Sequence, residues 1–200
     1  MGKGRMEAFS DGVLAIIITI MVLDLHAPAA ATAAALAALL PSFLGYLLSF
    51  VYVAIYWNNH HHLVHALQRV SGAILWANLH LLFWLSLIHW ATRWLGEYPG
   101  AVLPTFVYGL ILLMAALAYF LLQRLIMDQD GNGAWLRRAI GADGKGKLSL
   151  LCYTLALCLA VVAPIAAQGL FVVVALLWLI PDRRIERALR IADEPARPGR

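Results

Sequence analysis

The sequence predicts an all-α integral membrane protein, a bundle of six transmembrane helices. Hydrophobic residues make up 62% of the 200-residue chain and charged residues only 13%. A soluble domain of this length is usually about half apolar and about a quarter charged. The apolar residues also gather in runs, several of them near the roughly 20 residues that a transmembrane helix needs. The excess apolar surface therefore requires lipid as its solvent.

The expected spans follow one another at residues 6–25, 34–57, 72–95, 101–125, 148–163 and 166–180. Pro28 falls in the short link after the first span, and Pro164 separates the last two spans as a tight hairpin. Residues 128–147, rich in Gly, Asp, Lys and Arg, are typical of a loop. We expect one transmembrane unit over residues 1–181 and a basic cytoplasmic tail over residues 182–200.

The spans differ in their polar residues. The second is followed by a polar extension, WNNHHHLVHALQRV. The third contains Asn78, His80, Ser86 and His89, so one side of it must face protein or water. Cys152 and Cys158 both fall inside the fifth span, where small apolar packing is a better interpretation than a disulfide or a metal pair.

Basic residues lie almost entirely on one side of the expected membrane. Lys3 and Arg5 precede the first span, Arg69 follows the second, and more surround residues 128–147 and the tail, whereas Arg93 alone falls on the other side. Positively charged loops stay in the cytoplasm. We therefore expect a multi-pass protein of the plasma membrane with both termini cytoplasmic. The basic tail is interpreted as a topology and anionic-lipid signal rather than as a nucleic-acid site.

The first span carries an acidic residue, Asp11, about two turns into the helix. An ionised carboxylate at this depth is costly unless it is paired or in water. Arg5 lies six residues earlier and off to one side, so Asp11 is expected to reach a partner on another helix, with Ser10 beside it. Two interpretations stay open: an ion or proton site, and a polar network that fixes this helix against its neighbours.

An aliphatic stripe follows Asp11 on the same helix. Ile16, Ile20 and Leu23 occupy positions i, i+4 and i+7, and Thr19 lies beside them. Such a stripe ordinarily packs in a core or faces lipid. Asp24, just past it, is either a charge that concentrates cations at the outer mouth or a solvated helix end.

The head of the first span resembles a known family. Arg5, Phe9, Ser10 and Asp11 form the pattern R-x-x-x-F-S-D, which is similar to the signature of the bacterial branch of the transmembrane protein 175 family of potassium-selective channels. Trp57, Asn58 and His61 at the end of the second span also resemble that family. Asn78, Leu82 and Ser86 fit its third span, but His89 stands where its relatives tend to carry a proline.

This resemblance implies a homo-tetramer in which the first helix of each chain lines a central pore for potassium ions. It assigns the pore constriction to Ile16, Ile20 and Leu23 and a hydroxyl-bearing selectivity layer to Thr19. It assigns a structural network behind the pore helix to Arg5, Phe9, Ser10, Asp11, Trp57, Asn58 and His61. It implies no cofactor and no resident metal, with potassium as the permeant ion, and membrane lipids as surroundings.

Two other functions were weighed against a passive cation channel. One is a proton-coupled transporter or proton-conducting channel that uses Asp11 and His61. The other is a membrane metalloprotein built on the histidines, since His61 and His65 have the i, i+4 spacing that can grip a metal and His80 and His89 could ligate haem. No CxxC, HExxH or CxxCH motif accompanies them, and no set of catalytic residues indicates an enzyme.

Overall fold

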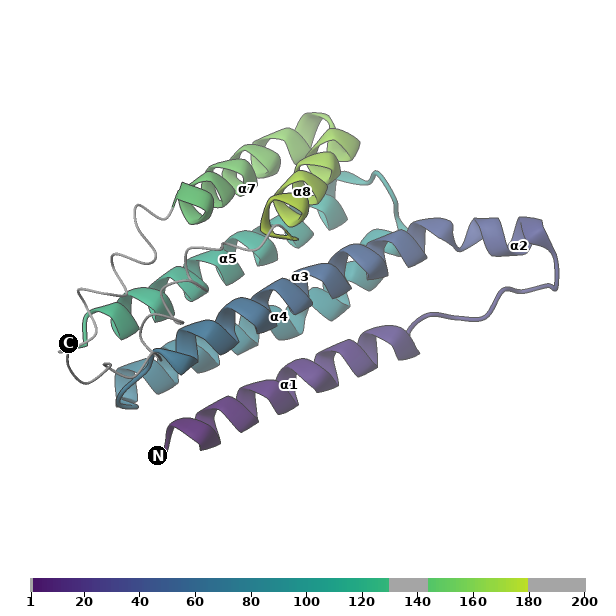
Figure 1. Cartoon of the computed structure of the whole chain (residues 1–200). Helices are drawn as coiled ribbons and strands as arrows, with labels where there is room; N and C mark the ends of the chain where they lie inside the picture. The colour runs from purple at the N-terminus through teal and green to yellow at the C-terminus, as the bar shows by residue number, and fades with distance from the viewer. Residues whose placement is uncertain (1, 130–143, 180–200) are drawn as a thin grey trace, which may run out of the picture.

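The computed structural model describes residues 2–129 and 144–179, and the secondary structure of this part of the chain is helical. Its helices are α1 (Lys3–Leu23), α2 (Ala33–Ala38), α3 (Leu40–His65), α4 (Gly72–Glu97), α5 (Val102–Met127), α7 (Gly144–Val162) and α8 (Pro164–Leu179). The long helices lie side by side, so their ends gather at two ends of the bundle (Figure 1). The predicted all-α membrane fold is confirmed. Most of the expected loop at 128–147 and the expected tail at 182–200 lie outside the described residues.

Within the described residues, five helices are long and apolar enough to cross a membrane: α1, α3, α4, α5 and α7. The apolar helix α8 has only 16 residues, about 24 Å at 1.5 Å per residue, whereas the hydrocarbon core is roughly 30 Å thick. The second expected span differs most from the structure. Residues 34–57 were expected to form it, but α3 runs from Leu40 through the polar extension to His65, and the short α2 precedes it.

The helix starts follow from local chemistry. Thr32 and Ser71 are N-caps whose hydroxyl oxygens accept hydrogen bonds from the backbone amides of the first turns of α2 and α4. Such caps satisfy amides that have no partner within the helix. Pro41 lies in the first turn of α3, where its missing N–H costs nothing. A proline inside the expected second span therefore marks the true beginning of that helix.

The bundle has a centre and two flanks. Helices α3, α4 and α5 pack together, α1 packs on α3 and α4, and the α7–α8 hairpin packs on α3 and α5. Figure 1 shows α1 and the hairpin on opposite sides of this centre. Gly109 allows α5 and the α7–α8 hairpin to pack closely, because a Cβ at this position would lie only 2.8 Å from the Phe171 ring of α8. Helix α1 is thus a peripheral helix of the single chain.

A series of hydroxyl groups joins α3, α4 and α5 toward the Glu97 end of α4. The Thr92 hydroxyl donates to the Ile88 carbonyl at 2.6 Å, and the Ser49 Oγ lies 2.6 Å from Thr92 Oγ1 and 2.8 Å from the Tyr108 hydroxyl. Since the Thr92 proton is already used, Ser49 donates to Thr92 and Tyr108 donates to Ser49. Each of these three hydroxyl groups therefore has a hydrogen-bond partner, as buried polar groups usually do.

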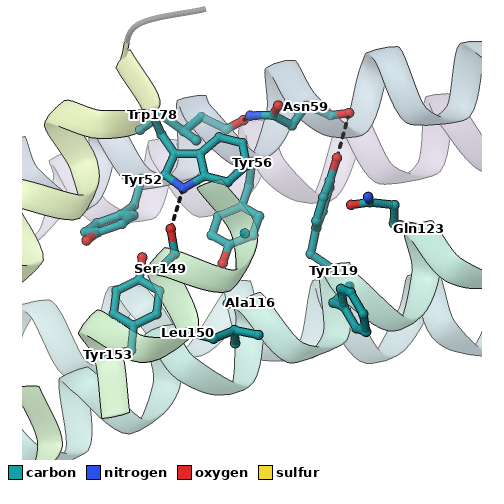
Figure 2. Close-up of a pocket in the computed structure, with 13 residues that line it drawn as sticks. Tyr52, Tyr56, Asn59, Ala116, Tyr119, Gln123, Ser149, Leu150, Tyr153 and Trp178 are labelled. Carbon is teal, nitrogen blue, oxygen red and sulfur yellow. Dashed lines mark hydrogen bonds between the residues drawn. The ribbon is translucent and has the colours of Figure 1, made fainter. Parts of the chain in front are cut away.

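A narrow pocket of about 50 Å³ lies between α3, α5, α7 and α8. Figure 2 shows tyrosines and Trp178 in its lining, where the Trp178 indole donates to Ser149 at 2.7 Å and the Tyr119 hydroxyl donates to the Asn59 carbonyl at 3.3 Å. Its residues come from the centre and the hairpin, and none comes from α1. This pocket is a feature of the hairpin junction and plays no part in the site described next.

Candidate functional site on the first helix

The two faces of α1 have different environments. Met6, Ser10, Leu14, Ile17 and Met21 are buried against the rest of the chain. They recur every three or four residues, which places them on one side of the helix. This side packs on α3 and α4.

The opposite face of α1 carries the predicted pore residues, and the single chain leaves it bare. Ile16 is 59% exposed, Ile20 42% and Leu23 75%, and Thr19 is exposed between them. Phe9 is half-exposed and falls on the same side, since positions 9, 16 and 23 recur every seven residues. The sequence resemblance assigned Phe9 to the network behind the helix, whereas the structure places it on the bare face.

The Thr19 side chain has a definite hydrogen-bond state. Its hydroxyl donates to the Ala15 carbonyl one turn earlier, at 2.8 Å. A hydroxyl has one proton and two lone pairs. With the proton directed to the backbone, the oxygen offers its lone pairs outward from the exposed face.

Three polar contacts one helical turn apart join α1 to the antiparallel α3; we call these contacts the α1–α3 ladder. Lys3 donates to the His65 carbonyl at 2.6 Å, Glu7 lies 3.2 Å from His61, and the Trp57 indole donates to Asp11 at 3.0 Å. Along α1 the positions increase by four while along α3 they decrease by four, which is the register of two antiparallel helices. Asp11 therefore has its partner on another helix.

A second set of bonds joins α1 to both neighbours inside the bundle. The Asn78 amide of α4 donates to Ser10 at 2.9 Å, and Ser10 donates to the Met6 carbonyl at 2.9 Å. The Asn78 carbonyl oxygen lies 2.7 Å from His60 Nε2, which must then be the donor. Ser10, Asn78 and His60 are all buried. We call them the three-helix clasp.

The structure brings together only part of the predicted network. Ser10 and Asp11 of α1 are hydrogen-bonded to other helices, and Trp57 and His61 contact α1. Arg5 and Asn58 are exposed, and their side chains make no hydrogen bond or ion pair with the described residues.

Glu7, His60 and Asn78 belong to this region, although the sequence-predicted network did not include them. The signal for Glu7 was its spacing of four residues from Asp11, because Trp57 and His61 on α3 have the same spacing. The signal for Asn78 was an amide inside an apolar span, which needs a protein partner in lipid.

The histidines and cysteines do not gather into a metal site in the described part of the chain. It contains no group of three or more His, Cys, Asp or Glu side chains that could hold a metal ion. His61 and His65 lie with ring centroids 6.4 Å apart, and His80 accepts a hydrogen bond from Trp84 on its own helix. Cys152 and Cys158 are free thiols.

The C-terminal end of α1 contacts α4 through Asp24. Asp24 follows the last helical residue, and its carboxylate lies 3.3 Å from His89 Nε2 and 3.9 Å from an Arg93 nitrogen. Arg93 also pairs with Glu97 at 3.1 Å. The Asp24 carboxylate is therefore part of an ion-pair cluster with α4 rather than a free charge at a helix end.

Known proteins share this sequence and architecture. Residues 5–88 match the family model described as the endosomal/lysosomal potassium channel TMEM175. A potassium channel of Chryseobacterium sp. (strain P1-3) is 51% identical over 190 residues, which are 95% of this chain and 99% of that protein. A potassium channel of Streptomyces collinus is 38% identical over 125 residues, which are 58% of this chain and 61% of that one.

A solved structure extends the likeness to the fold. The crystal structure of a lysosomal potassium-selective channel TMEM175 homologue from Chamaesiphon minutus matches with a TM-score of 0.76 and 28% identity, over 90% of this chain and 97% of that one. The family assignment rests on more than the signature at the head of α1, because this chain is 51% identical to a relative over nearly the whole length of both proteins. This membrane protein therefore belongs to the TMEM175 family of potassium channels, which are not enzymes and need no cofactor.

Proposed function

We propose that this chain conducts potassium ions passively through a pore lined by the bare face of α1. The observation that carries the proposal is the exposure of this face of α1 in a member of a potassium channel family. Helix α1 packs on α3 and α4 through its buried side, whereas Ile16, Thr19 and Leu23 are exposed in the single chain. A pore wall made of the same face from several copies accounts for this arrangement.

The proposed assembly is a closed homo-tetramer. One chain has a single bare α1 face, so a pore enclosed on all sides needs several copies around an axis, and homo-oligomers usually close by rotational symmetry. Lipid would then contact the outer helices. Native mass spectrometry of the protein in detergent micelles tests the number of subunits, and the expected result is a mass of four chains.

The proposed gate consists of rings of Ile16, Ile20 and Leu23. A ring of aliphatic side chains closes a narrow pore by excluding water, without blocking it fully by contact. A small rotation or dilation of α1 admits water and opens the path. Selectivity is assigned to a ring of Thr19 hydroxyls, because their outward lone pairs can replace part of the hydration shell of a potassium ion.

The α1–α3 ladder and the three-helix clasp are proposed as the support of this pore helix. Ser10, Asp11, Trp57 and His61 hold the inner half of α1 through hydrogen bonds and an ion pair. The remaining predicted network residues, Arg5, Phe9 and Asn58, are exposed in the single chain and are proposed to contact a neighbouring copy. Residues 1–181 form the channel unit in this proposal, and residues 182–200 a basic cytoplasmic tail.

Potassium flux into liposomes that contain the purified protein tests the proposal. We expect flux down a potassium gradient, exceeding sodium flux and independent of any imposed proton gradient. Flux that requires a proton gradient would instead favour the proton-coupled transporter.

Ile16→Asn tests the position of the gate. An amide at the constriction should wet it and raise the potassium flux severalfold. Leu151→Asn is the matched control, because Leu151 is 66% exposed on α7, far from α1, and its replacement should leave flux unchanged. Equal flux from the Ile16 variant and the native protein would mean that Ile16 is not part of the constriction.

A further inference from the structure

The pocket between α3, α5, α7 and α8 contains two buried polar groups without a partner. Gln123 of α5 is 6% exposed and Tyr56 of α3 is 8% exposed. Both side chains line the pocket (Figure 2), yet neither the Gln123 amide nor the Tyr56 hydroxyl makes a hydrogen bond with the described residues. Buried polar groups almost always have a partner, either in the protein or in a bound molecule. The pocket therefore indicates an occupant.

The neighbouring polar groups leave mainly donors for that occupant. The Trp178 indole donates to Ser149, Ser149 donates to the Lys145 carbonyl at 2.8 Å, and the Asn59 amide donates to the Ile55 carbonyl at 2.8 Å. The two unpartnered groups, a primary amide and a phenol, still have their N–H and O–H protons to donate. The residues that line the pocket include no Asp or Glu to accept them. An occupant with acceptor oxygens, such as a phosphate or an ester, is complementary to this lining.

The size of the pocket shows that most of the occupant lies outside it. A cavity of about 150 Å³ holds one benzene ring, so the 50 Å³ available here holds only a few non-hydrogen atoms. The pocket reaches the surface of the chain, because Phe120, Leu150 and Trp178 in its lining are partly exposed. Leu148 and Leu151 on the same helix as Leu150 are 46% and 66% exposed. A molecule that inserts a polar group and lays apolar chains along α7 fits this surface.

Basic side chains beside the pocket indicate the charge of the polar group. Arg124 follows Gln123 in the last turn of α5, and Lys145 and Lys147 flank the pocket residue Gly146 on α7. Arg124 and Lys147 are exposed. Basic pockets between transmembrane helices attract the anionic headgroups of lipids. The apolar surface, the acceptor oxygens and the negative charge together describe an anionic phospholipid.

We propose that this pocket binds an anionic phospholipid from the leaflet at the Lys3 end of the bundle. Gln123 and Tyr56 donate hydrogen bonds to its phosphate or ester oxygens. Arg124 and Lys147 pair with the phosphate, and the acyl chains lie along the exposed leucines of α7. The lipid fills the space between four helices and so strengthens the attachment of the α7–α8 hairpin. Binding here does not depend on the pore proposed above, because no residue of α1 lines the pocket.

Native mass spectrometry of the full-length, delipidated protein in detergent micelles measures the binding. The protein is titrated with dioleoyl phosphatidylglycerol, which is anionic, or with dioleoyl phosphatidylcholine, which is zwitterionic, and its melting temperature is recorded with each lipid. We expect phosphatidylglycerol to bind more tightly, at one molecule per chain, and to raise the melting temperature more.

Gln123→Leu separates lipid binding from a purely structural role. Loss of one hydrogen bond should weaken phosphatidylglycerol binding about two- to tenfold and reduce the lipid-dependent rise in melting temperature. The lipid-free variant should melt at the native temperature or above, because it no longer buries an unpartnered amide. Gln168→Leu is the matched control on α8: Gln168 donates to Thr105, so its loss should lower the melting temperature and leave lipid binding unchanged.

A second pair of variants tests the headgroup charge. Lys147→Gln should reduce the preference for phosphatidylglycerol over phosphatidylcholine. Arg69→Gln removes an exposed basic side chain at the same end of the bundle but outside the pocket lining, and it should keep the native preference. Equal binding of the two lipids by the native protein would overturn the anionic headgroup.

The remaining outcomes decide between the lipid and other occupants. Unchanged phosphatidylglycerol binding in Gln123→Leu would overturn the pocket as the site. An equal rise in melting temperature with inorganic phosphate alone would assign the pocket to a free anion, and no response to either lipid would leave water as its occupant; each result overturns the proposal. If Gln123→Leu does not fold, Tyr56→Phe removes the other donor but keeps the ring, and it must weaken phosphatidylglycerol binding to a similar extent.

Discussion

At the scale of single residues, Asp11 has a defined structural partner. Its carboxylate accepts the Trp57 indole proton at 3.0 Å, and Glu7 one turn earlier lies beside His61. Both pairs connect α1 to α3 and lie off the bare face that carries Ile16. We therefore expect Asp11 to act on the position of the helix, and this role predicts which substitutions are tolerated.

Asp11→Ala should mainly reduce the yield and thermal stability of the assembled protein. The loss should be about 1 kcal/mol, because the bond is a single hydrogen bond to a half-exposed indole. Asp11→Asn keeps an acceptor oxygen and should recover most of the stability. Melting temperatures in detergent, followed by size-exclusion chromatography, measure the effect. A stable Asp11→Asn assembly with altered potassium-to-sodium preference would instead place Asp11 in the ion path.

The neighbouring isoleucines Ile16 and Ile17 show what the sequence can and cannot predict at this scale. Ile17 is 5% exposed and Ile16 59% exposed. Nearly every residue from 12 to 23 is apolar, so hydropathy alone cannot say which side of the helix meets protein. The spacing of Ile16, Ile20 and Leu23 shows a stripe, but its role in a pore was predicted only through a family resemblance. Polar residues gave a firmer signal, because Asp11 and Asn78 must find partners in lipid wherever they occur.

At the scale of elements, buried polar chains fix helices that lipid alone would not hold together. Apolar helices gain little from contact with one another in lipid, so packing and interhelical hydrogen bonds determine their association. The three-helix clasp joins α1, α3 and α4 toward the Lys3 end of α1, and the Tyr108–Ser49–Thr92 series joins α3, α4 and α5 toward the Glu97 end of α4. Both chains end at a hydroxyl that donates to a backbone carbonyl four residues earlier.

Asn78→Leu should destabilise the clasp more than Ser10→Ala. Leucine at position 78 leaves both the Ser10 acceptor and the His60 donor without a partner, whereas alanine at position 10 removes only the acceptor of one Asn78 proton. We expect a loss of about 1–3 kcal/mol for Asn78→Leu. The double variant should cost little more than Asn78→Leu alone, since the two side chains share one bond. Thermal melting of the three variants measures this, and additive losses would mean that the clasp does not act as a unit.

The element bounds were predictable where a capping residue marks them and less so where polar residues continue a helix. Pro41 and Ser71 lie at the true helix starts. The polar stretch from Asn58 to His65 was expected as an extension beyond the second span, yet it is the last part of α3 itself. The ladder joins this end of α3 to α1, and His60 joins it to Asn78 of α4. The ladder contacts join residues about fifty positions apart, and no local pattern encodes them.

At the scale of the whole molecule, the distribution of charge predicts the orientation in the membrane. The ends of α1 and α3 that meet at Lys3 and His65 lie at the same end of the bundle as the contact between Gln129 and Arg69 (Figure 1). This end also carries Arg5, Arg124, Lys145 and Lys147. At the opposite end Arg93 is paired with Asp24 and Glu97, so the basic side chain found there is balanced by two carboxylates.

The positive-inside rule therefore predicts that the Lys3 end lies in the cytoplasm. Single cysteines test this in a variant whose Cys152 and Cys158 are replaced by alanine. Tyr98→Cys, in the exposed link after α4, should react with a membrane-impermeant maleimide on intact cells. Gln68→Cys, in the link between α3 and α4, should react only after the membrane is permeabilised. The reverse pattern would place the Lys3 end outside the cell and would contradict the orientation predicted from the charges.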